Sequence, residues 1–185
     1  MSDLGLNRPF SVFISHGIED VNLVKAFADI LVWNNVYPLV AEYQPDLGKL
    51  LWKEKIKKLI NDCNYFVVLY TYTAQNKMKV HQEIGSAGMK DKRIIVLLQD
   101  GIDRKDLPGF LEGLEIVENF NLADPFLGLN EVTRFLLWNW YRVLTKFYGY
   151  EEAYGKILIK FDELSNVWNR YKYDPLRGNW QLIQQ

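Results

Sequence analysis

Cysteine and histidine are scarce in this sequence. The chain has one cysteine, Cys63, and two histidines among its 185 residues. A single cysteine excludes an intrachain disulfide bond. A structural zinc site takes four cysteine or histidine ligands and is therefore disfavoured, so we expect no metal. Cys63 lies between a helical stretch and an apolar strand, and we interpret it as a small buried side chain rather than a reactive thiol.

Long apolar segments are missing as well. No run approaches the ~20 apolar residues that a membrane-spanning helix needs. The first residues also lack the basic stretch and apolar stretch of a signal peptide. We therefore expect a cytoplasmic protein without a membrane partner.

The chain has no excess of positive charge. Its 22 Lys and Arg are balanced by 23 Asp and Glu, for a net charge of −1. A nucleic-acid-binding protein needs a basic face to neutralise phosphates, so nucleic acid is not an expected partner. The glycine fingerprint of a dinucleotide-binding dehydrogenase does not follow the first predicted strand either, which disfavours a redox enzyme.

What the sequence does contain is an alternation of short apolar runs with amphipathic segments. Short β-prone runs predict strands, and apolar residues at three- and four-residue spacing predict helices. The predicted strands cover residues 10–15, 36–41, 65–70, 93–98 and 116–120, and the helices between them cover about 20–33, 52–60 and 80–89. Strands that alternate with helices over short connections predict an α/β fold with a parallel sheet covered on both faces.

The expected architecture is a flavodoxin-like, doubly wound five-stranded parallel sheet with strand order 2-1-3-4-5. Pro38 in the second strand is typical of a sheet edge. From about residue 124 the pattern becomes wholly helical, with an apolar face that includes Val143 and Phe147. We predict an α/β domain over residues 1–123 and a C-terminal helical extension over residues 124–185 that packs on it. The extension is rich in Trp and Tyr, so part of its surface could instead serve a partner.

The predicted strand order places a ligand site beyond the carboxyl ends of the first and third strands. Open doubly wound sheets bind ligands where the strand order reverses. Ser15 and His16 end the first strand, residues 70–73 end the third, and the loop from Tyr43 to Gly48 can fold over the opening. Glu83 lies on the helix that follows the third strand. We interpret Asp20 as a helix-start residue.

Four segments, in the right order and spacing, resemble Toll/interleukin-1 receptor (TIR) domains. They are Phe13-Ile14-Ser15-His16 with Glu19-Asp20, the glycine-containing loop 42–49, the third-strand segment 63–71, and Val80-His81-Gln82-Glu83-Ile84-Gly85-Ser86-Ala87. Together they cover about residues 10–121. The resemblance is strongest to free-standing prokaryotic TIR proteins, some of which act in antiphage defence of the Thoeris-like kind.

For NAD-cleaving members, the resemblance implies hydrolysis of the nicotinamide–ribose bond, with NAD as substrate and no cofactor. The products are nicotinamide and either ADP-ribose or a cyclic ADP-ribose-type signal. The resemblance implies Glu83 as the catalytic carboxylate beside the ribose. Many such members carry tryptophan four residues before this glutamate, where this chain has Lys79. Tyr70 or Tyr72 could replace that aromatic wall. The expected substrate-binding residues are Ser15, His16, Tyr43, Gly48, Tyr70 and Thr71.

Two other functions remain open from the sequence. The domain could be a non-catalytic module that assembles with other TIR domains, or a hydrolase or transferase acting on the N-glycosidic bond of nucleosides. Fold alone does not separate these functions. The resemblance also implies self-association through TIR surfaces and, if a cyclic product forms, a downstream effector that senses it.

Overall fold

A computed structural model of the chain describes residues 10–34, 36–43, 52–111, 117–174 and 179–182. Five strands form one parallel sheet in the order β2-β1-β3-β4-β5. The strands are β1 (Ser11–Ser15), β2 (Tyr37–Leu39), β3 (Tyr65–Tyr70), β4 (Arg93–Gln99) and β5 (Val117–Phe120). This order confirms the predicted flavodoxin-like fold. Pro38 pairs with Val12 at the sheet edge, where its missing N–H costs no interior hydrogen bond.

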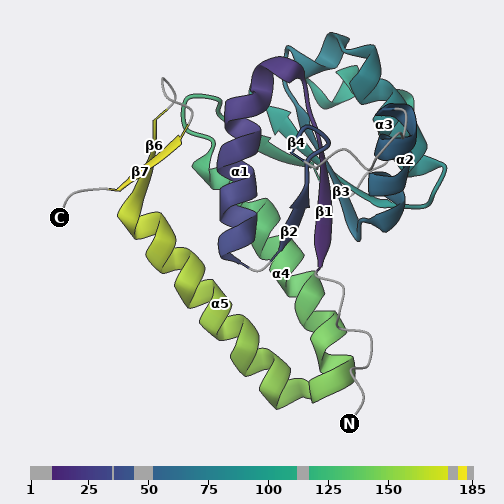
Figure 1. The fold of residues 1–185 in the computed structure, drawn as a ribbon. Coiled ribbons are helices and arrows are strands. Elements are labelled where there is room, and N and C mark those ends of the chain that lie inside the picture. Colours follow the sequence, from purple (N-terminus) through teal and green to yellow (C-terminus); the bar gives the residue numbers. More distant parts are fainter. Residues whose placement is uncertain (1–9, 35, 44–51, 112–116, 175–178, 183–185) are drawn as a thin grey trace.

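Helices cover both faces of the sheet (Figure 1). α1 (Val21–Trp33) and α4 (Phe126–Tyr148) pack on one face, and α2 (Trp52–Asp62) and α3 (Met78–Gly88) pack on the other. Alternate residues of each strand point to opposite faces, so every central strand contributes to two cores. In β3, Tyr65, Val67 and Leu69 join the α1/α4 core, while Phe66, Val68 and Tyr70 join the α2/α3 core. This double burial explains why the central strands are almost wholly apolar.

α4 approaches the sheet closely because Gly128 has no side chain. A β-carbon built at Gly128 would lie 2.6 Å from the Phe120 β-carbon and 2.8 Å from the Asn119 carbonyl oxygen. Leu129, Val132 and Leu136 then enter the core beside α1. α4 thus packs directly on β4 and β5.

The C-terminal part of the chain ends in a hairpin that the sequence pattern did not predict. α5 (Tyr150–Arg170) packs against α4, and an antiparallel pair follows, formed by β6 (Tyr171–Asp174) and β7 (Asn179–Leu182). β7 contacts α1, so the chain returns to the face on which α1 lies (Figure 1). The predicted helical pair is therefore present, but it does not extend to the end of the chain. The division at residue 123 stays a prediction.

Two apolar side chains of α4 point away from the core in which they were expected. On α4 the buried stripe includes Leu137, Tyr141 and Leu144, whereas Val143 and Phe147 are exposed. The stripe drifts around a helix of this length because 3.6 residues per turn does not match a fixed repeat. On α2, Ile56, Leu59 and Ile60 are buried, whereas Trp52 is exposed.

No helix in the described ranges is long and apolar enough to cross a membrane. Within those same ranges, no three or more His, Cys, Asp and Glu side chains are grouped so that they could hold a metal ion. Cys63 is buried, as predicted, and its thiol donates a hydrogen bond to the Ile60 carbonyl oxygen at 3.1 Å.

We expect Gly128→Ala to lower the free energy of unfolding by about 1–3 kcal/mol, because the added methyl group meets backbone and core atoms. Gly155 in α5 is the matched control, since a β-carbon there meets nothing within 4 Å. Gly155→Ala should raise the free energy of unfolding by up to about 1 kcal/mol through helix propensity. Urea unfolding of both variants checks this, and equal shifts in the two would contradict the close approach at Gly128.

Candidate active site

The candidate site lies at the carboxyl edge of the sheet, between β1 and β3, where the strand order reverses. Phe13 of β1 points to the α2/α3 core, and Ser15, two residues later, points to the same side. On α3, Val80, Ile84 and Ala87 form the buried stripe. Glu83 falls within this stripe, which turns its carboxylate toward the end of β1.

Glu83 and Ser15 are joined by a short hydrogen bond. The Ser15 hydroxyl donates to Glu83 Oε2 at 2.6 Å, and Glu83 is only 4% exposed. Burial raises the pKa of Glu83 to about 7, against the opposing effects of the Ser15 hydrogen bond and the Lys79 charge. The predicted glutamate is thus a buried carboxyl group that changes charge near neutral pH.

Lys79 links Glu83 to a second carboxylate, Glu42. The Lys79 ammonium lies 2.7 Å from Glu42 Oε1 and 3.9 Å from Glu83 Oε1. Glu42 Oε2 in turn lies 3.7 Å from His16 Nε2. Burial on its own would raise the pKa of Glu42, but the Lys79 hydrogen bond and the His16 charge outweigh it, and the pKa falls below its ordinary value. Glu42 therefore keeps its charge at neutral pH, whereas the more deeply buried Glu83 has a pKa near neutrality.

An aromatic ring lies beside this group, but it comes from α2. The Lys79 ammonium lies 5.0 Å from the centre of the Trp52 ring, and Lys55 lies 5.2 Å from it. Trp52 is 46% exposed, so part of its ring is accessible. The expected replacements do not take this place: the Tyr70 ring meets His81 edge-on at 6.4 Å, and Tyr72 is exposed beside Gly101.

Asp20 lies at the edge of the candidate site and has contacts that the sequence did not predict. Asp20 directly precedes α1, in its N-cap position, but its side chain makes no capping hydrogen bond to the helix. Its carboxylate is buried and instead accepts hydrogen bonds from Thr71 at 2.7 Å and from Thr73 at 3.1 Å. Burial raises the pKa of Asp20, although both threonines oppose this effect. These bonds tie the loop after β1 to the end of β3, and Asp20 also lines a cavity of about 550 Å³ toward residues 121–123.

The structure thus brings some of the predicted residues together and gives others different contacts. Ser15, His16 and Glu83 form one connected group with Glu42 and Lys79. The Thr71 hydroxyl is taken up by Asp20 and by the Ala74 N–H. Tyr43 donates to the Val21 carbonyl oxygen at 3.4 Å, at the start of α1. Gly48 lies outside the described residues.

Comparison with protein families places this geometry in context. A model of the TIR domain matches residues 12–129. The chain belongs to the TIR domain family. The match spans β1 to the start of α4, so it includes every residue of the connected group around Glu83. The resemblance predicted from the four sequence segments is confirmed.

Solved structures that align with this chain include TIR domains and a CMP N-glycosidase. The TIR domains of the activated Roq1 resistosome, which directly recognises the pathogen effector XopQ, align with 14% identity and a TM-score of 0.46, over 89% of this chain and 87% of that chain. The CMP N-glycosidase BcmB of Clostridium botulinum aligns with 19% identity and a TM-score of 0.43, over 68% of this chain and 97% of its own. Among curated proteins there is no match.

The raised pKa of Glu83 predicts how stability changes with pH. In the unfolded chain this carboxyl group loses its proton near pH 4.5, whereas in the folded protein it does so near pH 7. The unfolded state therefore binds fewer protons between these values, and stability falls as the pH rises through this window. Glu83→Gln removes that loss. The variant should match the wild type below pH 4.5 and be more stable at pH 8, by up to about 3 kcal/mol.

Chemical unfolding at a series of pH values measures this difference. Glu54→Gln on α2 is the control, because the Glu54 side chain is exposed and keeps its water in both states. A difference between wild type and Glu83→Gln that does not change between pH 4.5 and pH 8 would contradict the assignment of the titration to Glu83.

Proposed function

We propose that this TIR domain is an NAD glycohydrolase or cyclase that cleaves the bond between nicotinamide and ribose. The observation that carries the proposal is the buried Glu83 carboxyl group, held by Ser15 at the point where the strand order reverses. A glutamate on the buried stripe of a helix lowers stability at neutral pH, and a functional requirement explains why such a residue stands there. Perturbed carboxyl groups of this kind concentrate at functional sites.

In the proposed reaction, Glu83 acts as a carboxylate beside the ribose. Its Oε2 accepts from Ser15, whereas among the described residues Oε1 has only the more distant Lys79 ammonium at 3.9 Å. Oε1 is therefore the oxygen that can accept a hydrogen bond from a ribose hydroxyl. The bond electrons leave with nicotinamide, which departs neutral, and the ribose carbon becomes oxocarbenium-like. The negative charge of Glu83 stabilises that cation.

The intermediate is then captured by a nucleophile. Water that attacks the ribose carbon gives ADP-ribose and releases a proton, while attack by the adenine ring gives a cyclic product. The cationic nicotinamide ring of NAD favours the ionised form of Glu83 when it lies close by, since an opposite charge nearby lowers the pKa of a carboxyl group. A group with a pKa of about 7 in the free protein is thus poised to ionise when NAD binds.

We further propose that Trp52 supplies the aromatic wall that the lysine at position 79 cannot. The ammonium of Lys79 lies over the Trp52 ring, at 5.0 Å from its centre. A cation over an indole face is held by the ring's quadrupole. The nicotinamide ring of NAD is itself cationic and flat, so it is a suitable partner for the same face. Lys79 keeps Glu42 as its partner when it leaves the ring.

The wider role follows the family. We propose that the domain self-associates through TIR surfaces, that it acts in the cytoplasm in prokaryotic immune signalling, and that a cyclic product would be read by a downstream effector. The lysine at position 79 favours one alternative, in which the domain only assembles with other TIR domains and does not cleave NAD. Cleavage of nucleosides is the other alternative, and it differs from NAD cleavage in the substrate that is consumed.

We expect concentrated protein to release nicotinamide from NAD, and we expect Glu83→Gln to lower kcat by about 100-fold or more, as loss of a charge-stabilising group does. Liquid chromatography of nicotinamide and ADP-ribose products measures both. Glu54→Gln should retain full activity, because that side chain is exposed on α2.

The same assay separates the alternatives. Nicotinamide release that is unchanged in Glu83→Gln would remove Glu83 from the reaction. No release at high protein concentration with a crowding agent would favour the assembly module. Release of free base from nucleosides in place of nicotinamide from NAD would favour the nucleoside hydrolase.

Trp52 gives a second test. Trp52→Ala should raise KM for NAD about tenfold or more, in line with a stacking contribution of about 1–3 kcal/mol, whereas Trp52→Phe keeps a flat ring and should change KM much less. Trp33 is the matched control, because it is also a partly exposed tryptophan but ends α1 on the opposite face of the sheet. An equal rise in KM for Trp52→Ala and Trp52→Phe would contradict the stacking role.

A further inference from the structure

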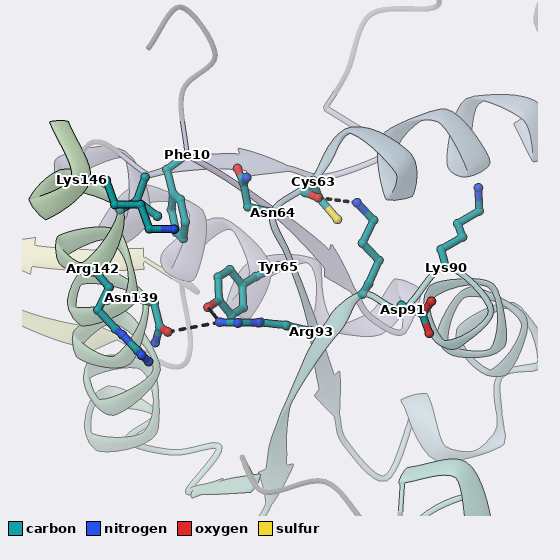
Figure 2. A pocket seen from close by; sticks show the side chains of 12 residues that line it. Phe10, Cys63, Asn64, Tyr65, Lys90, Asp91, Arg93, Asn139, Arg142 and Lys146 are labelled. Atoms are coloured by element: carbon teal, nitrogen blue, oxygen red, sulfur yellow. Dashed lines mark hydrogen bonds between the residues drawn. The ribbon is translucent and has the colours of Figure 1, made fainter. Parts of the chain in front are cut away.

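A cavity of about 580 Å³ lies at the opposite edge of the sheet from Glu83. Figure 2 shows it between α4 and the amino ends of β3 and β4. Phe10, which precedes β1, and Tyr65, the first residue of β3, form its inner wall. The turn between α3 and β4 forms one side, and Asn139, Arg142 and Lys146 of α4 form the other. A volume of this size is within the range of small-molecule sites, about 300–1,000 Å³.

The cavity concentrates positive charge in a chain whose net charge is −1. Five cationic side chains and one carboxylate line it: Lys90, Lys92, Arg93, Arg142, Lys146 and Asp91. Within the described ranges, none of the five cations forms an ion pair with a carboxylate. Uncompensated cations gathered on the walls of one cavity repel each other, and a bound anion relieves that repulsion.

Three of the cations also have structural contacts, which fix their positions. Lys92 donates to the carbonyl oxygens of Asn61 at 2.8 Å and Cys63 at 2.7 Å, at the end of α2. Lys90 donates to the Asn61 side chain. The Arg93 guanidinium lies over the Tyr65 ring, 5.8 Å from its centre, and donates to the Tyr65 hydroxyl at 2.9 Å. These contacts neutralise none of the charge, because every acceptor is uncharged.

Arg142 and Lys146 have no such structural role. They are one turn apart on α4, both exposed, and they face the cavity from the side opposite the α3–β4 turn (Figure 2). Neither side chain has a hydrogen-bond or ion-pair partner among the described residues, whereas Arg134, two turns earlier on α4, pairs with Glu131. Arg142 is thus available to bind an anion with its planar group of N–H donors, the geometry that suits phosphate oxygens.

We propose that this cavity is a binding site for a small molecule that carries two or more linked phosphate groups. Cations on two facing walls suit an anion with charge at more than one position. A cavity, rather than a flat basic face, suits a small molecule more than an acidic protein surface. Because the site is at the amino edge of the sheet and Glu83 is at the carboxyl edge, the proposal does not rest on NAD cleavage.

Inorganic pyrophosphate is the probe for this site. Isothermal titration of the full chain, at constant ionic strength, should show saturable binding at one site per chain. The double variant Arg142→Ala/Lys146→Ala should weaken that binding about tenfold or more, a loss that corresponds to ~1.4 kcal/mol. Both side chains are exposed, so the fold should survive, which unfolding curves would verify. Arg134→Ala, outside the cavity on the same helix, should bind like the wild type.

ADP and pyrophosphate both carry two linked phosphate groups, but only ADP carries a nucleoside. Titration with each probe tests whether the site recognises the nucleoside as well as the phosphates. Tighter binding of ADP than of pyrophosphate would support a nucleotide as the ligand, and equal binding would support recognition of the phosphates alone. Absence of saturable binding by either probe at millimolar concentration would overturn the proposal. So would an equal loss of binding in Arg134→Ala, or tighter binding of a hexaglutamate peptide than of pyrophosphate.

Discussion

The pairing of β1 with β3 at the centre of the sheet is the interaction on which the remaining structure depends. Both strands are buried on both faces, so each contributes side chains to two separate cores. Their parallel register aligns Ser15 with Val68, and it brings the loops that follow both strands to one edge. Asp20 then joins these loops through Thr71 and Thr73. The group around Glu83 lies at that edge, so the distances within it depend on the register of β1 and β3.

The connected group around Glu83 combines two opposing electrostatic effects. Burial disfavours the charged carboxylate, while Ser15 and Lys79 favour it, and burial is the larger effect. Lys79 lies closer to Glu42 than to Glu83. It therefore stabilises the charge of Glu42 more strongly, and Glu42 stays ionised. Two carboxylates in different environments on one lysine give the site one fixed charge and one that changes near neutral pH. Such an arrangement would suit the proposed substrate NAD, because its nicotinamide ring is positively charged.

The sequence predicted the fold well because its signals are local. Apolar strand runs, helix spacing and the edge proline at position 38 each follow from neighbouring residues, and the structure confirms the strand order. Glu83 was chosen from the sequence because its helix follows the third strand, next to the point where the strand order reverses, and because of the resemblance to TIR domains. The contacts around it could not be predicted in this way. Glu42 reaches Lys79 across 37 residues, and Asp20 reaches Thr71 across 51, and no local pattern encodes such pairs. The contact between the Trp52 ring and Lys79 was missed for the same reason, because the two residues lie far apart in the sequence. The hairpin of β6 and β7 was missed because two four-residue strands give almost no periodic signal.

The contact between β7 and α1 has a consequence for how the chain folds. It joins segments that are far apart in the sequence, so forming it closes a loop that contains β2, β3, β4 and β5 of the sheet. Loop-closure entropy grows slowly with loop length, but contacts of such large sequence separation form late and slow the folding reaction. α1 can dock on the sheet early through its neighbours β1 and β2, and the hairpin can reach it only after α4 and α5 are in place. We therefore expect the C-terminal hairpin to pack on α1 late in folding, after the elements between them have assembled.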